Sequence, residues 1–114
     1  TTASDALWMG LPVLTQTGST FAGRVAASLL SGAGLPEMVT HSPGEYEALA
    51  LKLAREPAVL AAVTAKLRAN RDQCALFDTT RMTQSLEAAY TEMWQRAQRG
   101  LAPATFMVGG PLPP

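Results

Sequence analysis

The uneven placement of charged side chains is the sequence feature that most constrains the fold. Only two of the first 36 residues are charged, Asp5 and Arg24, whereas the residues that follow carry sixteen charged side chains. So low a density of charge is typical of a segment that lies in a protein core. Within it, the apolar run 11–15, bounded by Gly10 and Gly18, predicts a short strand covered on both faces, as in a parallel sheet between helices.

The sequence offers few strands for such a sheet. One candidate is Pro12–Gln16, and a weaker one is Glu37–Thr40. Two short strands do not make a sheet that helices cover on both sides, so we expect the other strands to come from another part of the protein. We therefore predict an α/β fold and interpret the chain as a C-terminal fragment of a larger α/β domain.

Start signals and apolar periodicity predict helices along the rest of the chain. Their predicted positions are Thr2–Met9, a segment after Thr20 that ends at Gly32 or Gly34, a segment from the capping box at Ser42–Glu45 to Pro57, a segment that begins at Pro57, and Thr79–Gln98 capped by Asp78. In the segment after Pro57, we expect Leu60, Val63 and Leu67 to face the core. The solvated face of that segment is predicted to carry Lys66, Arg68 and Arg71.

The predicted helix at Thr79–Gln98 is long for a small domain. Its apolar stripe comprises Met82, Leu86, Ala89, Met93 and Ala97, with Tyr90 and Trp94 beside it. At about 30 Å it is expected to reach across to a second body. Residues 1–100 are predicted to form one domain portion, and residues 101–114, rich in proline and glycine, a flexible tail.

Composition excludes several classes of protein. Nine acidic and nine basic residues give a formal net charge of zero, which argues against binding to nucleic acid. No run of 18 apolar residues predicts a membrane span, so no membrane partner is expected. Because Cys74 is the only cysteine and no signal-like stretch follows Thr1, we expect a cytoplasmic protein.

Metal and cofactor motifs are not evident. His41 is the only histidine, and no set of histidine, cysteine or carboxylate positions has the spacing of metal ligands. We therefore expect no metal site and no cofactor. His41 is interpreted as an exposed loop residue and Cys74 as a packing residue.

The opening residues Thr1-Thr2-Ala3-Ser4-Asp5 are the one candidate site. The first turn of a helix offers free main-chain N–H groups that hold phosphate, and threonine hydroxyls add donors. A carboxylate one turn further on, as Asp5 is, suits the two hydroxyls of a ribose. The competing hypothesis is an ordinary capping box between Thr2 and Asp5, which needs no ligand.

Arg24 poses a similar choice. As the only basic residue of the first 36, it is a candidate to contact a ligand phosphate. The alternative is a structural ion pair with a carboxylate such as Asp5 or Glu37.

Five separated motifs carry a resemblance to a known family. They are TTASDALWMGLPVLT at 1–15, RVAAS at 24–28, EYE at 45–47, LFDT at 76–79 and YTEMW at 90–94. In this order they resemble the end of the O-linked N-acetylglucosamine transferase family, which includes the SPINDLY-type proteins. The resemblance extends to about Gly100.

The resemblance implies the latter part of the Rossmann-like, nucleotide-binding domain of a GT-B glycosyltransferase, preceded by tetratricopeptide (TPR) repeats. In that family a His-Thr-Thr-x-x-Asp motif binds uridine diphosphate (UDP), with the threonines at the diphosphate and the aspartate at the ribose. Thr1, Thr2 and Asp5 match it residue by residue. The family's histidine, its lysine near the diphosphate and its uracil and sugar contacts lie outside this chain, so no catalytic residue is assigned.

The implied reaction is inverting transfer of N-acetylglucosamine from UDP-GlcNAc to serine or threonine hydroxyls of proteins. The implied partners are this donor, the protein acceptor, the remainder of the catalytic region and the TPR repeats, and the fragment alone is not expected to be active. Two alternatives stay open: a catalytically lapsed, repeat-containing scaffold, and a GT-B transferase that uses another nucleotide sugar such as GDP-fucose.

Overall fold

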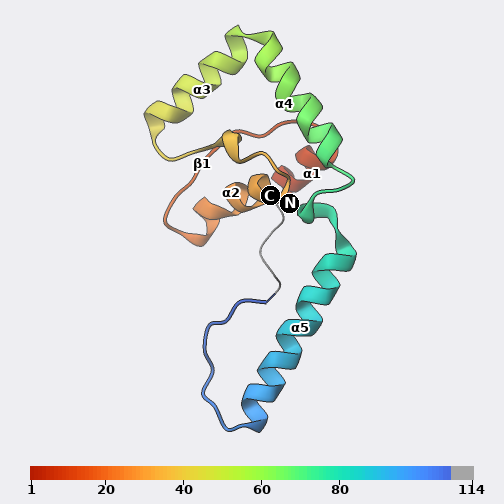
Figure 1. The fold of residues 1–114 in the computed structure, drawn as a ribbon. Helices are drawn as coiled ribbons and strands as arrows, with labels where there is room; N and C mark the ends of the chain where they lie inside the picture. The colour runs from red at the N-terminus through yellow and green to blue at the C-terminus, as the bar shows by residue number, and fades with distance from the viewer. Residues whose placement is uncertain (109–114) are drawn as a thin grey trace. The chain divides into compact units, whose positions relative to one another are not determined.

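The computed structural model describes residues 1–108, and these fall in two compact units, the first Thr1–Phe77 and the second beginning at Asp78 (Figure 1). The first unit contains helix α1 (Thr2–Trp8), strand β1 (Thr15–Gln16), helix α2 (Phe21–Gly32), a 3-10 turn η1 (Pro36–Met38), strand β2 (Val39–Thr40), helix α3 (Pro43–Arg55), helix α4 (Pro57–Asn70) and a second 3-10 turn η2 (Ala75–Phe77). The second unit contains helix α5 (Thr79–Gln98).

The two strands of the first unit form a small parallel sheet. Thr15 lies opposite Val39 and Gln16 opposite Thr40, with α2 in the connection between the strands. The hydroxyl of Thr40 is buried and donates a 2.9 Å hydrogen bond to the carbonyl of Thr15. A strand–helix–strand unit with a parallel pair is α/β, as predicted, although helices dominate the described residues.

Both predicted strands are longer than the observed ones. Of Pro12–Gln16 only the last two residues pair, because β2 offers two partner residues within the described part of the chain and Pro12 has no N–H to donate. Glu37 and Met38 belong to η1 rather than to a strand, because Pro36 sets the φ angle of the first residue of that turn. The predictions for these outer residues are wrong.

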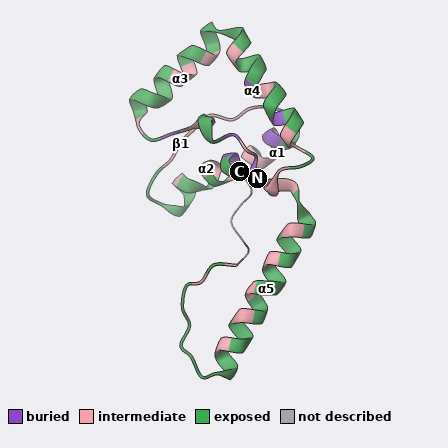
Figure 2. Cartoon of the chain, viewed as in Figure 1, coloured by how far each residue is buried: buried purple, intermediate pink, exposed green. Residues whose placement is uncertain are grey.

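The buried residues of the first unit lie far apart in the sequence (Figure 2). Its buried apolar residues are Leu7, Leu30, Ala33, Leu35, Met38, Val63 and Leu67. They come from α1, from α2 and the segment after it, from η1 and from α4. Of the face predicted for α4, Val63 and Leu67 are buried, whereas Leu60 is 41% exposed.

The capping signal at Ser42 is confirmed. The Ser42 hydroxyl accepts a 3.2 Å hydrogen bond from the N–H of Glu45, and Pro43 occupies the first position of α3. The Glu45 carboxylate accepts a 2.7 Å bond from the N–H of His41. Helices α3 and α4 are separated by Glu56 and meet at a sharp bend (Figure 1).

Helix α5 has the predicted bounds, and Asp78 caps it by accepting a 2.8 Å bond from the N–H of Arg81. Its predicted stripe is mostly exposed: Met82 is 58% and Met93 55% exposed, whereas Ala89 is half-buried. No helix of the described residues has the length and apolar character needed to cross a membrane. Whether α5 reaches a second body stays a prediction.

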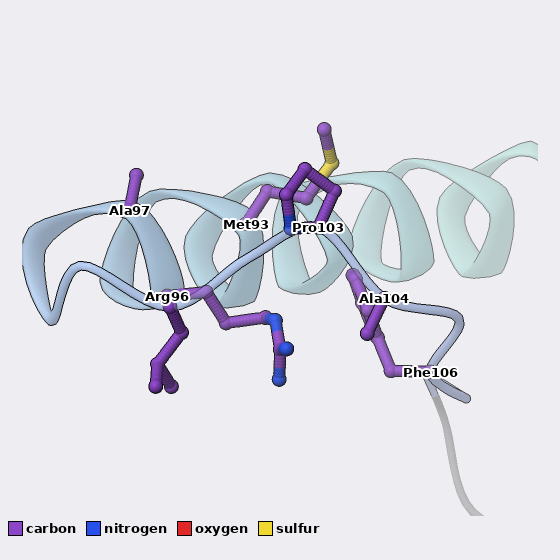
Figure 3. A pocket seen from close by; sticks show the side chains of 7 residues that line it. Met93, Arg96, Ala97, Pro103, Ala104 and Phe106 are labelled. Atoms are coloured by element: carbon purple, nitrogen blue, oxygen red, sulfur yellow. The ribbon is translucent and has the colours of Figure 1, made fainter.

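The chain after α5 carries no helix or strand between residues 101 and 108. The side chain of Arg96 donates a 3.0 Å hydrogen bond to the carbonyl of Ala102, which holds this segment beside the helix. Side chains of α5 and of this segment line an apolar pocket of about 350 Å³ (Figure 3). They are Met93, Arg96, Ala97, Leu101, Pro103, Ala104 and Phe106. The flexible tail stays a prediction, and its last six residues lie outside the described part.

Candidate functional site

The start of α1 differs from the predicted capping box. The N-cap residue is Thr1, one residue earlier than the box requires, and its side chain makes no capping hydrogen bond. The Thr1 carbonyl instead accepts a 2.9 Å bond from the N–H of Asp5 and a 2.7 Å bond from the hydroxyl of Ser4. Because Thr2 already lies inside the helix, its hydroxyl is not at the capping position, and the prediction of a box between Thr2 and Asp5 is wrong.

The side chains of Thr1, Thr2 and Asp5 are brought together by the helix. Residues three and four apart lie on the same helical face, so Asp5 shares a face with both threonines. All three residues are exposed. Among residues 1–108, no hydrogen bond or ion pair occupies the two threonine hydroxyls or the Asp5 carboxylate.

The main chain adds donors at the same place. The first N–H groups of a helix have no acceptor within it, which here leaves the N–H groups of Thr2, Ala3 and Ser4 free. Such groups, together with hydroxyl donors, bind phosphate oxygens. The carboxylate of Asp5 only accepts hydrogen bonds, so it suits a ligand that carries hydroxyl groups next to its phosphates.

The other end of α1 is fixed to the body of the unit. Leu7 is fully buried in the core. Gly10 follows the helix at a φ angle of +79°, and the N–H groups of Gly10 and Leu11 donate bonds of 3.0 and 2.9 Å to the carbonyls of Leu7 and Ala6. This closing turn requires a residue that tolerates positive φ, which favours glycine.

Arg24 forms neither of the predicted ion pairs, with Asp5 or with Glu37. Glu37 pairs instead with Lys66 at 2.7 Å, and Asp5 has no ion-pair partner in the described residues. The exposed Arg24 lies along an open groove of about 400 Å³ on α2. The other lining residues are Phe21, Val25, Ser28 and Leu29. A contact between Arg24 and a ligand phosphate stays a prediction.

His41 and Cys74 occupy ordinary environments. His41 is exposed before the Ser42 cap, as predicted. Cys74 is half-buried, and its thiol lies 3.7 Å from the carbonyl of Arg71. No three histidine, cysteine or carboxylate side chains gather as a metal site in the part of the chain that the structure describes.

Arg71 makes a contact that the sequence pattern did not predict. Its side chain is 39% exposed, in keeping with the predicted solvated face, and its guanidinium also lies over the ring of Trp8, 5.3 Å from the ring centre. Trp8 is the last residue of α1. No local signal predicts this pairing, because 63 residues separate the two side chains.

Comparison with known proteins identifies the family. Residues 1–86 match the model of glycosyl transferase family 41. A probable UDP-N-acetylglucosamine–peptide N-acetylglucosaminyltransferase SEC of Arabidopsis thaliana is 42% identical over 109 residues, which are 95% of this chain and 11% of that protein. The UDP-N-acetylglucosamine–peptide N-acetylglucosaminyltransferase of Caenorhabditis elegans is 35% identical over 101 residues, covering 89% of this chain and 9% of the relative.

A solved structure agrees with these relatives. A mutant of the Thermobaculum terrenum O-GlcNAc transferase matches with a TM-score of 0.80 and 40% identity, over 89% of this chain and 19% of that one. These matches place the α/β chain in the class of glycosyltransferases. The chain belongs to glycosyl transferase family 41, which confirms the resemblance to O-linked N-acetylglucosamine transferases. It spans about a tenth of the length of these curated relatives.

Proposed function

We propose that this chain is part of a GT-B glycosyltransferase that transfers N-acetylglucosamine from UDP-GlcNAc to serine or threonine hydroxyls of proteins. The names of the relatives support the donor and the peptide acceptor. The parallel strand–helix–strand unit supports a place in a Rossmann-like nucleotide-binding domain. The remaining catalytic region and TPR repeats would supply the rest of the enzyme.

In this proposal the start of α1 holds part of the donor. Thr1 and Thr2 donate hydrogen bonds to the diphosphate, and Asp5 accepts hydrogen bonds from the ribose hydroxyls. The observation that carries the proposal is that these three side chains share one exposed helical face and are not engaged by the described chain itself. In a capping box, the side chains of Thr2 and Asp5 would instead be hydrogen-bonded to main-chain N–H groups.

The same donors assist the reaction. As the bond between the sugar and the diphosphate breaks, negative charge grows on the leaving phosphate. Donors that the fold already holds in place stabilise this charge without reorganising. Hydroxyl and N–H donors can do so without a metal ion, so we expect a metal-independent reaction.

The proposal is tested by calorimetric titration of UDP into the full-length protein and into its Asp5→Asn variant. We expect micromolar binding to the wild type, about −8 kcal/mol, and binding at least about tenfold weaker in the variant. Asp78→Asn is the matched control, because asparagine retains the cap of α5 and the residue lies in the other unit.

Each outcome of the titration has a definite meaning. Unchanged UDP affinity in Asp5→Asn contradicts the ribose contact. Absence of UDP binding to the wild type contradicts the proposed donor and leaves the lapsed scaffold. Binding of GDP-fucose in preference to UDP-GlcNAc would instead identify a transferase of another nucleotide sugar.

A further inference from the structure

Trp8, Arg71 and Phe77 form a cluster at the C-terminal end of α1, which we call the Trp8 clamp. The Arg71 guanidinium lies 5.3 Å from the centre of the Trp8 ring, and its Nη1 is 3.5 Å from the Trp8 carbonyl oxygen. The rings of Trp8 and Phe77 meet edge to face, with 5.0 Å between ring centres and 70° between ring planes. A helix end, a cation and two aromatic rings are thus assembled from three separate segments.

The Trp8 clamp adds to the attachment of helix α1. The helix has seven residues, and Leu7 is its only buried one. Leu7 and the closing turn at Gly10 hold its C-terminal end, whereas Ala3, Ser4 and Ala6 are only half-buried. The Trp8 clamp supplies a further point of attachment, on the residue next to Leu7.

We propose that Arg71 is a positioning residue for the nucleotide site: by holding Trp8, it fixes the direction in which α1 presents Thr1, Thr2 and Asp5. This inference rests on the function proposed above. The helix spans only about 10 Å, so a tilt at Trp8 displaces the groups at its start. Displacements of about 1 Å are enough to weaken a site that depends on orientation.

The chemistry of arginine suits this role. Its planar guanidinium stacks on an aromatic face, which a lysine ammonium does less well. Its positive charge also lies at the end of α1 where the main-chain carbonyls lack helical partners. The neighbouring contact with Asp72, at 3.4 Å, involves a 75% exposed carboxylate and contributes little.

The test is calorimetric titration of UDP into full-length variants. We expect Arg71→Ala to weaken UDP binding by roughly two- to fivefold, the range of an exposed cation–aromatic contact. Arg71→Lys should recover part of this loss, because the charge remains. Arg55→Ala, which removes an exposed arginine from the end of α3, is the matched control and should bind as the wild type does.

A double-mutant cycle with Asp5→Asn separates positioning from general destabilisation. If Arg71 acts through the start of α1, Arg71→Ala should weaken UDP binding by a smaller factor once Asp5 has been replaced, because one of the contacts it positions is gone. Equal losses in both backgrounds would overturn the inference while leaving the proposed function intact. A normal Asp5→Asn effect with unchanged binding in Arg71→Ala would also overturn it.

Melting temperatures of the same variants complete the test. Arg71 is 39% exposed at its side chain, so Arg71→Ala is expected to retain the fold. If UDP binding weakens only in step with a fall in melting temperature, and does so in both Arg71→Ala and Arg71→Lys, the positioning role is overturned. If Asp5→Asn itself binds UDP as the wild type does, the proposed function fails and the inference fails with it.

Discussion

The side-chain amide of Asn70 donates a 3.1 Å hydrogen bond to the main-chain carbonyl of Ala33, 37 residues earlier in the chain. Asn70 is the last residue of α4, and Ala33 is the C-cap residue of α2. The last carbonyls of a helix have no partner within it, and Ala33 is fully buried. The bond therefore satisfies a buried acceptor and joins two helices that the core also brings together.

We expect Asn70→Ala to destabilise the first unit by about 1–3 kcal/mol, because it leaves the buried carbonyl of Ala33 without this donor. Hydrogen exchange of the amides of residues 29–35 in the full-length protein would measure the loss. Gln73→Ala, at an exposed position shortly after α4, serves as the control and should leave this exchange unchanged. Unchanged exchange in Asn70→Ala would show that the bond contributes nothing.

We expect Gly34→Ala to destabilise the same region. Gly34 has a φ angle of +74°, and a Cβ there would lie 2.5 Å from the Asn70 amide nitrogen. The backbone conformation alone costs about 1–2 kcal/mol for a residue with a side chain, and the clash adds to it. Gly44→Ala is the control, because no atom lies within 4 Å of its added Cβ and it sits within α3. Hydrogen exchange should show faster opening for Gly34→Ala and no such change for Gly44→Ala.

We expect Leu67→Ala to cost about 2–5 kcal/mol, because it removes a fully buried side chain and leaves a cavity. Leu60 lies on the same helix but is 41% exposed, so Leu60→Ala should cost clearly less. Urea denaturation of both variants, monitored by hydrogen exchange at the buried amides, would compare their losses in the free energy of unfolding. Similar losses in both variants would contradict the observed core.

We expect Thr2→Val to lower kcat more than it weakens UDP binding, because a donor to the leaving phosphate acts most strongly in the transition state. Loss of one such donor raises the barrier by about 2–4 kcal/mol. Thr79→Val is the control, since Thr79 is the exposed first residue of α5 as Thr2 is of α1. Transfer kinetics with UDP-GlcNAc would check the prediction. An unchanged kcat would exclude Thr2 from assisting the leaving group.

Signals confined to a few neighbouring residues were the most predictable from the sequence. The bounds of α5 and its Asp78 cap, and the Ser42 cap of α3, agree with the structure. Each depends on hydrogen bonds between residues three or four apart, which the local sequence determines. The capping pattern at Thr2 failed because Thr2 already lies in the helix, whose N-cap residue is Thr1.

The sequence by itself determined the helices, the α/β class and, through matching motifs, the family and the three candidate donor contacts at Thr1, Thr2 and Asp5. Only the tertiary structure decided that Leu7 is buried, that Asn70 reaches Ala33, and that Arg71 contacts the ring of Trp8. These contacts join residues that lie tens of positions apart. Periodicity assigns a side chain to a face of its own helix, but which face meets another segment depends on how the whole chain packs.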